Sequence, residues 1–271
     1  MGRLLIGLSG KKGAGKDTAC AQILAHLLNT GAEGPTLAVP GVYGVNEEGK
    51  LYENVPTLPD PTPTIDWWIG NTATWLAMCA DVKVDCFARP IKEFCEHVLG
   101  ISHAQCWGTD AEKNSLTALR WDTKLMAMLQ SWPEALSQHA GQRYMTARQV
   151  MQVFGTDLMR SWKEDIWVDA LLRRVQRSRE RIVIVTDVRF EDELSGLASL
   201  SEAGWDTCIV RLLRDPYKND EHASETALDH LPLDSFDIVV PGDLSIAGQA
   251  DFLLPRIADR LDRKEYERVV V

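Results

Sequence analysis

The sequence predicts an α/β protein built on a parallel five-stranded sheet with flanking helices. Two observations lead to this fold class: short apolar runs recur along the chain, and segments with helical spacing of apolar residues separate them. The expected strands are residues 4–9, 82–88, 181–187, 207–213 and 236–240. Right-handed crossovers between such strands place ligands at the carboxyl ends of the strands.

The composition narrows the function classes. The 271 residues include 29 Lys and Arg against 39 Asp and Glu, a formal net charge of −10. This excess of acid argues against a nucleic-acid polymer as the main partner and against attraction to anionic membranes. No run approaches the ~18 consecutive apolar residues of a membrane span. Six cysteines without a C-x-x-C pair indicate free thiols in a reducing cytoplasm.

The first strand leads into a glycine-rich loop, and a segment with helical spacing follows it. Residues 10–16 fit the phosphate-binding pattern G-x-x-x-x-G-K, whose backbone N–H groups turn inward on a polyphosphate while the lysine reaches the outer phosphates. This pattern predicts a bound polyphosphate, and the family resemblance described below implies that ATP supplies it. The expected ATP-binding residues are Gly10, Lys12, Gly13, Ala14, Gly15, Lys16, Asp17 and Thr18.

One position departs from the usual pattern. Asp17 stands where Ser or Thr normally binds Mg²⁺, and Thr18 comes one residue later. Both are candidate Mg²⁺ sites, and Asp187, which ends the strand 181–187 like a Walker B aspartate, is a third candidate to organise the metal or its water. The residues leave open which of the three contacts the metal.

The segment 31–64 holds half of the chain's 12 prolines and is predicted to be an inserted, mostly irregular excursion. A passive surface loop is the more typical role for such a segment. Residues 91–175 are expected to be mainly helical. Within them, Cys95, His97, His103 and Cys106 suggest a metal site as an alternative, but their spacing matches no standard zinc frame and Cys95 fits the buried side of a helix.

Five segments in order carry a resemblance to a known family. They are G-L-S-G-K-K-G-A-G-K-D-T at 7–18, F-A-R-P-I-K at 87–92, T-A-R-Q-V-M-Q-V-F-G-T-D at 146–157 with Arg160 and Trp167, D-V-R-F-E-D-E at 187–193, and Arg214 followed by H-A-S-E at 222–225. Together they resemble the phage-type deoxynucleoside monophosphate kinases, which belong to the P-loop kinases.

The resemblance implies a single P-loop kinase-like domain over residues 1–271. It would comprise the insertion at 31–64, a helical acceptor-binding region at about 90–175 and a short lid at about 211–230. The resemblance also implies a homodimer and a viral origin, hence the host cytoplasm.

The implied reaction is ATP-dependent phosphorylation of a deoxynucleoside 5′-monophosphate by direct in-line transfer with Mg²⁺. Transfer between two anions requires cations at the junction, and guanidinium groups suit this task. The expected catalytic residues are Lys16, Arg148, Asp187, Arg189 and Arg214. The expected substrate-binding residues are Lys92, Arg148, Gln152, Gly155, Thr156, Trp167, Asp187, Arg189 and Glu193.

Two alternatives remain at this stage. One is another P-loop kinase for a small acceptor, such as a dephospho-coenzyme A or sugar-acid kinase, from which the stretch 148–167 would distinguish this chain. The other is a nucleotide-binding regulator without catalysis, against which the combination of Lys16, Asp187 and Arg189 argues.

Overall fold

The computed structural model describes residues 2–30, 43–53, 81–121, 144–215 and 223–269. Its contacts divide the chain into two compact units, which are described separately below. Unit 1 comprises residues 1–86 and 171–271, and unit 2 comprises residues 87–170. No helix among the described residues is both long and apolar enough to cross a membrane.

Unit 1 is built on a parallel sheet of five strands. These are β1 (Arg3–Gly10), β4 (Val82–Asp85), β7 (Ile182–Val188), β8 (Trp205–Leu212) and β9 (Ile238–Val240), in the order β4-β7-β1-β8-β9. The sheet confirms the five predicted strands and the α/β fold class. The central strand β1 pairs Ser9 with both Val188 of β7 and Arg211 of β8, so the carboxyl ends of three strands lie side by side.

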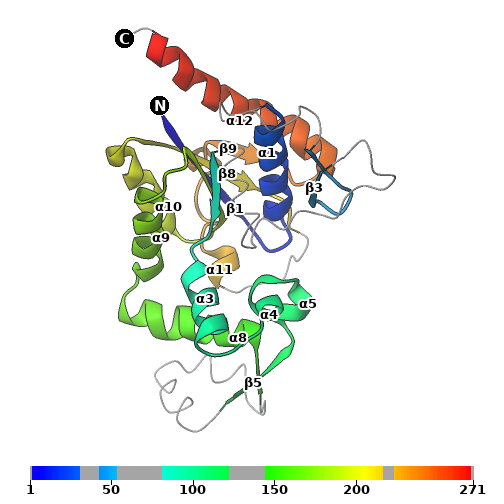
Figure 1. Cartoon of the computed structure of the whole chain (residues 1–271), viewed down its shortest axis with the longest axis vertical. Helices are drawn as coiled ribbons and strands as arrows, with labels where there is room; N and C mark the ends of the chain where they lie inside the picture. Colours follow the sequence, from blue (N-terminus) through cyan, green and yellow to red (C-terminus); the bar gives the residue numbers. More distant parts are fainter. Residues whose placement is uncertain (1, 31–42, 54–80, 122–143, 216–222, 270–271) are drawn as a thin grey trace. The chain divides into compact units, whose positions relative to one another are not determined.

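Helices cover both faces of this sheet. Alternate residues of β1 point to opposite faces, as in any strand. Ile6 and Leu8 belong to the core cluster shared with α1 (Lys16–Thr30) and α12 (Ile246–Val269). A side chain at Gly7 would instead meet Leu197 of α10 (Glu191–Ser199) on the opposite face. Figure 1 shows α1 and α12 on one side of the sheet and α10 on the other.

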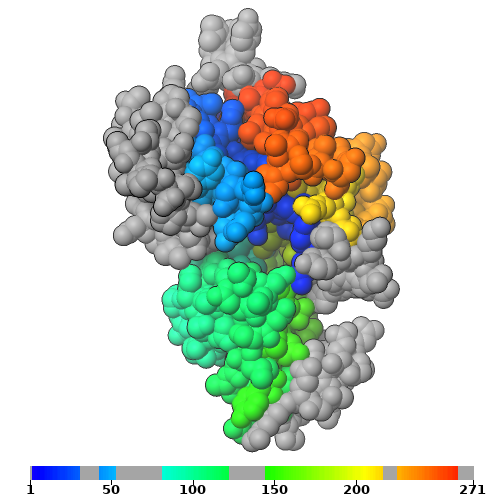
Figure 2. Space-filling view, turned by 90° about the vertical axis from the view of Figure 1, so that its right-hand side faces the viewer, coloured from blue at the N-terminus to red at the C-terminus, as the bar shows by residue number. Residues whose placement is uncertain are grey.

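A β-hairpin inside the proline-rich segment lies along α1. Its strands are β2 (Tyr43–Val45) and β3 (Leu51–Glu53). At one end, the Asn29 amide donates to Tyr43 O (2.8 Å) and accepts from Tyr43 N (3.0 Å). At the other end, Gly49 in the turn lies against Thr18. In Figure 2 the light-blue hairpin lies on the surface beside the blue of α1.

The hairpin corrects the prediction of a mostly irregular excursion for residues 43–53. The remainder of the predicted insertion, 31–42 and 54–64, lies outside the described residues. The hairpin strands have only three residues each, which is too short for an alternating pattern to stand out in the sequence.

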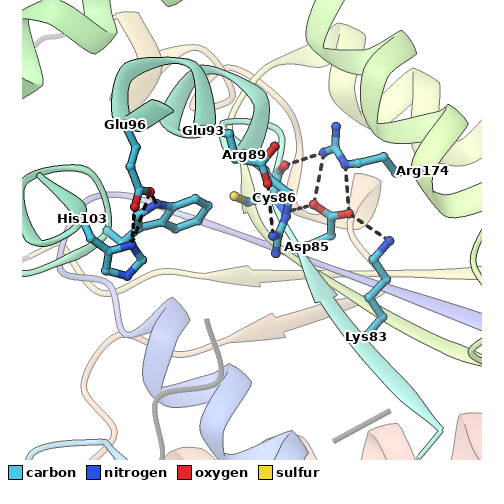
Figure 3. Close-up of polar contacts among 9 residues, drawn as sticks. Lys83, Asp85, Cys86, Arg89, Glu93, Glu96, His103 and Arg174 are labelled. Carbon is cyan, nitrogen blue, oxygen red and sulfur yellow. Dashed lines mark hydrogen bonds and ion pairs between the residues drawn. The ribbon is translucent and has the colours of Figure 1, made fainter. Parts of the chain in front are cut away.

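A buried carboxylate fastens the edge strand of the sheet. Asp85, at the end of β4, is fully buried and accepts two hydrogen bonds of 3.1 Å from Arg174 on α9 (Ile166–Gln176). The Cys86 amide donates to the same carboxylate (2.8 Å), and Lys83 lies 3.5 Å from it (Figure 3). Burying a carboxylate without such partners is costly, so Arg174 and Asp85 act as one structural unit.

Unit 2 is a small helical assembly. Its elements are α3 (Arg89–His97), α4 (His103–Trp107), α5 (Asp110–Lys113), β5 (Leu116–Arg120), β6 (Tyr144–Thr146), α8 (Ala147–Gln152) and the π-helix η2 (Val153–Arg160). Capping boxes at Ser102, Thr109 and Thr146 begin three of the helices. The mainly helical prediction is correct for these helices but missed the antiparallel β5–β6 pair.

The cysteines of the alternative metal site belong to the core of unit 2. Cys95 and Cys106 are both fully buried there. Burial raises the pKa of the Cys95 thiol to about 12 and also raises the pKa of Cys106, which disfavours the thiolate that a metal needs. His103 instead contacts Glu96 (3.1 Å), as Figure 3 shows.

The predicted lid at about 211–230 is described only in part. After β8, the described chain continues to residue 215 and resumes at α11 (Ala223–Thr226), and η4 (Leu233–Ser235) precedes β9. The remaining element, η3 (Leu200–Ala203), connects α10 to β8 through Gly204 in the left-handed conformation. Residues 216–222 lie outside the described residues, so the lid and the single domain over 1–271 stay predictions.

Candidate active site

The glycine-rich loop connects the central strand β1 to α1, which begins at Lys16. Gly10, Gly13 and Gly15 have φ angles of 151°, 72° and 94°. A Cβ atom at Gly10 would also come within 2.9 Å of the carbonyl oxygen of Leu212. The backbone therefore adopts a conformation that only glycine tolerates at these positions, which explains the spacing seen in the sequence.

Lys16 turns back over this loop. Its ammonium donates to the carbonyl oxygens of Gly10 (2.6 Å) and Lys11 (2.8 Å). Burial and, to a smaller extent, the nearby positive charge of Arg189 lower the pKa of Lys16 to about 8, while Glu225, Asp17 and Asp187 act in the opposite direction. An ammonium ion held in this way gains from an anionic partner.

Glu225 of α11 brings the loop and Arg189 together. Its side chain is only 7% exposed. One carboxylate oxygen accepts a hydrogen bond from the Lys12 amide (2.5 Å), and the other pairs with the Arg189 guanidinium. A backbone amide of the phosphate loop and a predicted catalytic arginine thus converge on one anionic group.

Glu193 positions Arg189 from the other direction. It is buried in the first turn of α10 and accepts hydrogen bonds from the amides of Arg189 (2.7 Å) and Phe190 (3.1 Å). This capping contact fixes the backbone just after β7, where the strand ends. The substrate-side role that the resemblance implies for Glu193 stays a prediction.

A second polar network lies beside the loop. Lys11 pairs with Asp215 (2.9 Å) and Asp229 (3.1 Å), and hydrogen bonds to both carboxylates raise its pKa. Arg211 donates to the Ser9 hydroxyl (3.0 Å) and to Asp229 (2.9 Å). The charged side chains of this network line a pocket with a volume of about 220 Å³. The exposed Arg214 lines this pocket as well.

The candidate Mg²⁺ residues lie in different surroundings. Asp17 is exposed in the first turn of α1, whereas Thr18 packs against Gly49 of the hairpin turn. Asp187 is partly buried near the end of β7. Asp17 and Asp187 both act electrostatically on Lys16, so their carboxylates lie near the loop, and carboxylate oxygen is a ligand type that Mg²⁺ accepts.

The predicted acceptor residues of unit 2 fall into two groups. The Trp167 indole N–H donates to Gly155 O (2.9 Å), which joins two predicted residues, and Thr156 is exposed on the same π-helix. Irregular helices of this kind are frequent at functional sites. Gln152 is partly buried at the end of α8.

The cationic members are held by neighbours within unit 2. Arg148 donates to Asn114 (2.8 Å) and Asp110 (2.5 Å), around α5. Lys92 lies over the Trp107 ring, 4.6 Å from its centroid. An acceptor phosphate would have to compete with these contacts for either side chain.

Several residues at the site were not among the predicted site residues, and three of them differ in the signal that the sequence gave. Lys11 occupies a variable position of the loop pattern and carried no signal of its own. Glu225 did have one, because it ends the H-A-S-E segment that forms part of the resemblance. Gln249 on α12 approaches Gly15 O at 3.4 Å, a contact for which nothing in the sequence gave a signal.

A phosphate loop between the central strand and α1, in a parallel sheet of order β4-β7-β1-β8-β9, defines the protein as a P-loop protein of kinase-like fold. A family model described as deoxynucleotide monophosphate kinase matches residues 87–249. The chain therefore belongs to the deoxynucleotide monophosphate kinase family, as the resemblance predicted. A search of curated proteins gave no match.

Proposed function

We propose that this protein transfers the terminal phosphoryl group of ATP to a deoxynucleoside 5′-monophosphate. The product is the diphosphate, formed by direct in-line attack without a covalent enzyme intermediate. The family supports kinase activity on deoxynucleotide monophosphates, and ATP, Mg²⁺ and the mechanism are the further content of this proposal.

The observation that carries the proposal is the convergence of the Lys12 amide and Arg189 on the Glu225 carboxylate, with Lys16 close by. Phosphoryl transfer needs such a cluster of donors, because charge spreads over the equatorial oxygens in the transition state. In this proposal, the loop amides and Lys16 hold the donor phosphates. Arg189 stabilises the charge on the group in transfer.

Unit 2 supplies the candidate acceptor groups. Arg148 and Lys92 are the cations suited to the acceptor phosphate, and Trp167 beside Gly155 offers an aromatic surface suited to a base. The family match extends over all of these residues.

Mg²⁺, when bound, would neutralise charge on the donor phosphates and help to align them. Asp17 and Asp187 are the carboxylates near the loop that fit this ion, either directly or through water. The packing of Thr18 against Gly49 makes its hydroxyl the weaker candidate.

The proposal is tested with purified protein, Mg-ATP and a panel of dTMP, dGMP, dCMP, dAMP and base-modified dCMP. We expect at least one of them to be converted to its diphosphate. Failure to convert any of them, with ATP binding verified separately, would overturn the proposed function.

The variant Lys16→Ala tests the role of the Lys16 ammonium in the same assay. It removes the ammonium but leaves the glycine backbone intact, so we expect turnover to fall by about 100-fold or more with the melting temperature within a few degrees of wild type. Near-normal turnover would contradict the role of Lys16.

The alternatives predict different outcomes in the same assay. A dephospho-coenzyme A or sugar-acid kinase would release ADP only with its own acceptor, and the family match across the stretch 148–167 argues against both. A regulator without catalysis would bind ATP but release no ADP with any acceptor.

A further inference from the structure

We propose that Glu225 is an internal counter-anion of the phosphate loop, which the donor phosphates displace, and that it thereby couples donor binding to the orientation of Arg189. This inference rests on the proposed function, since it concerns the donor side of the same site. It makes Glu225 a positioning residue, acting through Arg189 and the Lys12 amide.

The geometry of Glu225 matches that of a bound phosphate oxygen in two respects. Its carboxylate accepts the Lys12 N–H (2.5 Å), and amides of such loops are the groups that bind polyphosphate. Its second oxygen pairs with Arg189, whose guanidinium suits carboxylate and phosphate equally. A phosphate oxygen in the loop would therefore compete with Glu225 for both donors.

The charges around Glu225 also favour competition between its carboxylate and a bound phosphate. Glu225 lies close enough to Lys16 to favour its charged form, so the carboxylate stands among three donors, namely the Lys16 ammonium, the Lys12 amide and Arg189. A polyphosphate in that place would repel a carboxylate anion at hydrogen-bond distance from the same groups. Both anions cannot keep their full set of contacts, so binding of one must loosen the other.

Such an exchange gives the pair two arrangements. In the structure, Glu225 holds Arg189 beside the loop, and Glu193 fixes the backbone amide of Arg189 independently. When phosphate displaces the carboxylate from Lys12, Arg189 is released to contact the phosphoryl group. During that exchange, the hydrogen bond from the Arg189 amide to Glu193 keeps the backbone of Arg189 in place.

The binding test uses inorganic tripolyphosphate and the full chain in metal-free buffer, with calorimetric titration. Glu225→Gln removes the competing charge and keeps the side-chain shape. We therefore expect tripolyphosphate to bind to this variant about tenfold more tightly than to wild type. Glu225→Asp keeps the charge on a shorter stem that does not span both donors, and its affinity should lie between those of wild type and Glu225→Gln.

Asp229→Asn is the charge-matched control. Asp229 contacts the side chains of Lys11 and Arg211 and makes no contact with a loop amide in the structure. Its removal changes net charge by the same amount, but we expect less than a threefold change in tripolyphosphate affinity.

The kinetic test separates positioning from simple structural support. For Glu225→Gln we expect the donor KM to fall by about tenfold and kcat to change by less than threefold, because the carboxylate competes with the donor before binding and no longer holds Arg189 once the donor is bound. A purely structural glutamate would instead raise KM and lower the melting temperature.

Three results would overturn the inference: unchanged or weaker tripolyphosphate binding in both Glu225 variants, equal tightening in Asp229→Asn, or no tripolyphosphate binding by wild type at millimolar concentration. Tripolyphosphate binding requires no acceptor. If wild type and the variants behave as expected but no deoxynucleoside monophosphate is phosphorylated, the proposed function fails while the inference stands.

Discussion

Lys16 should give polyphosphate binding a pH dependence that starts near pH 8. Burial lowers the pKa of its ammonium from 10.5 to about 8 in the protein as described. A polyphosphate bound against Lys16 favours the charged form and raises that pKa again. Binding at a pH above 8 must therefore be accompanied by uptake of a proton.

The size of the effect follows from the two protonation states. Below pH 8 Lys16 is charged before and after binding, so affinity is nearly constant. Above pH 8 the apparent Kd rises about tenfold for each pH unit until the pKa of the complex is reached. With a pKa of about 8 in the free protein, Kd should rise about 25-fold between pH 7.5 and 9.5.

The measurement is calorimetric titration with ADP at pH 7.5, 8.5 and 9.5, a range in which the ADP phosphates are already ionised. Lys16→Arg is the control, because a guanidinium stays charged throughout and should give a nearly flat profile. A flat profile for wild type, or the same slope in Lys16→Arg, would refute the reasoning. Titration in buffers of different ionisation enthalpy would count the proton directly.

Two further predictions concern stability. Gly49 has a φ angle of 79°, and a Cβ atom there would lie 2.2 Å from the Thr18 hydroxyl, so Gly49→Ala should destabilise the protein by about 1–3 kcal/mol in urea denaturation. In a Thr18→Ala background the cost should fall to about 1 kcal/mol, and an undiminished cost would show that Thr18 is not the obstacle. Arg174→Met removes the bidentate partner of the buried Asp85, so we expect a loss of about 2–4 kcal/mol. The double variant with Asp85→Asn should lose less than the sum of the single changes, and strict additivity would mean that the two side chains act independently.

The elements that the sequence predicted well are those with strong local patterns. The run 182–185 is β-branched without interruption, and the structure places it fully inside the sheet as part of β7. The glycines of the phosphate loop were equally clear, because each position requires a backbone that other residues avoid. Local residue patterns of this kind can be recognised in a single sequence.

The elements that were missed have weak local patterns. Strands β2, β3 and β6 have only three residues each, and β5 alternates between exposed and half-buried positions with no buried residue. Such strands are stabilised by what they pack against, as the hairpin is by Asn29 and Thr18 on α1. The sequence does not record those neighbours.

Contacts between residues far apart in the sequence could not be predicted either. Lys12 and Glu225 are 213 positions apart, and Asp85 and Arg174 are 89 apart. The loop pattern includes Lys12 and the H-A-S-E segment includes Glu225, but neither pattern indicates that the two residues meet. Predicting that Arg148 is held by Asp110 and Asn114 would likewise have required the fold of unit 2.

The phosphate loop and the family match support each other through one contact. The match begins at residue 87, so the loop at 10–16 lies outside it, and its role rests on its sequence pattern and its backbone geometry. Arg189 and Glu225 lie inside the match, and both converge with Lys12 of the loop in unit 1. If the loop were merely a structural turn, nothing would require residues of the matched segment to place an arginine and an anion against it. A donor site for phosphoryl transfer requires such a convergence. Displacement of Glu225 by tripolyphosphate tests it at the carboxylate that contacts both the Lys12 amide and Arg189.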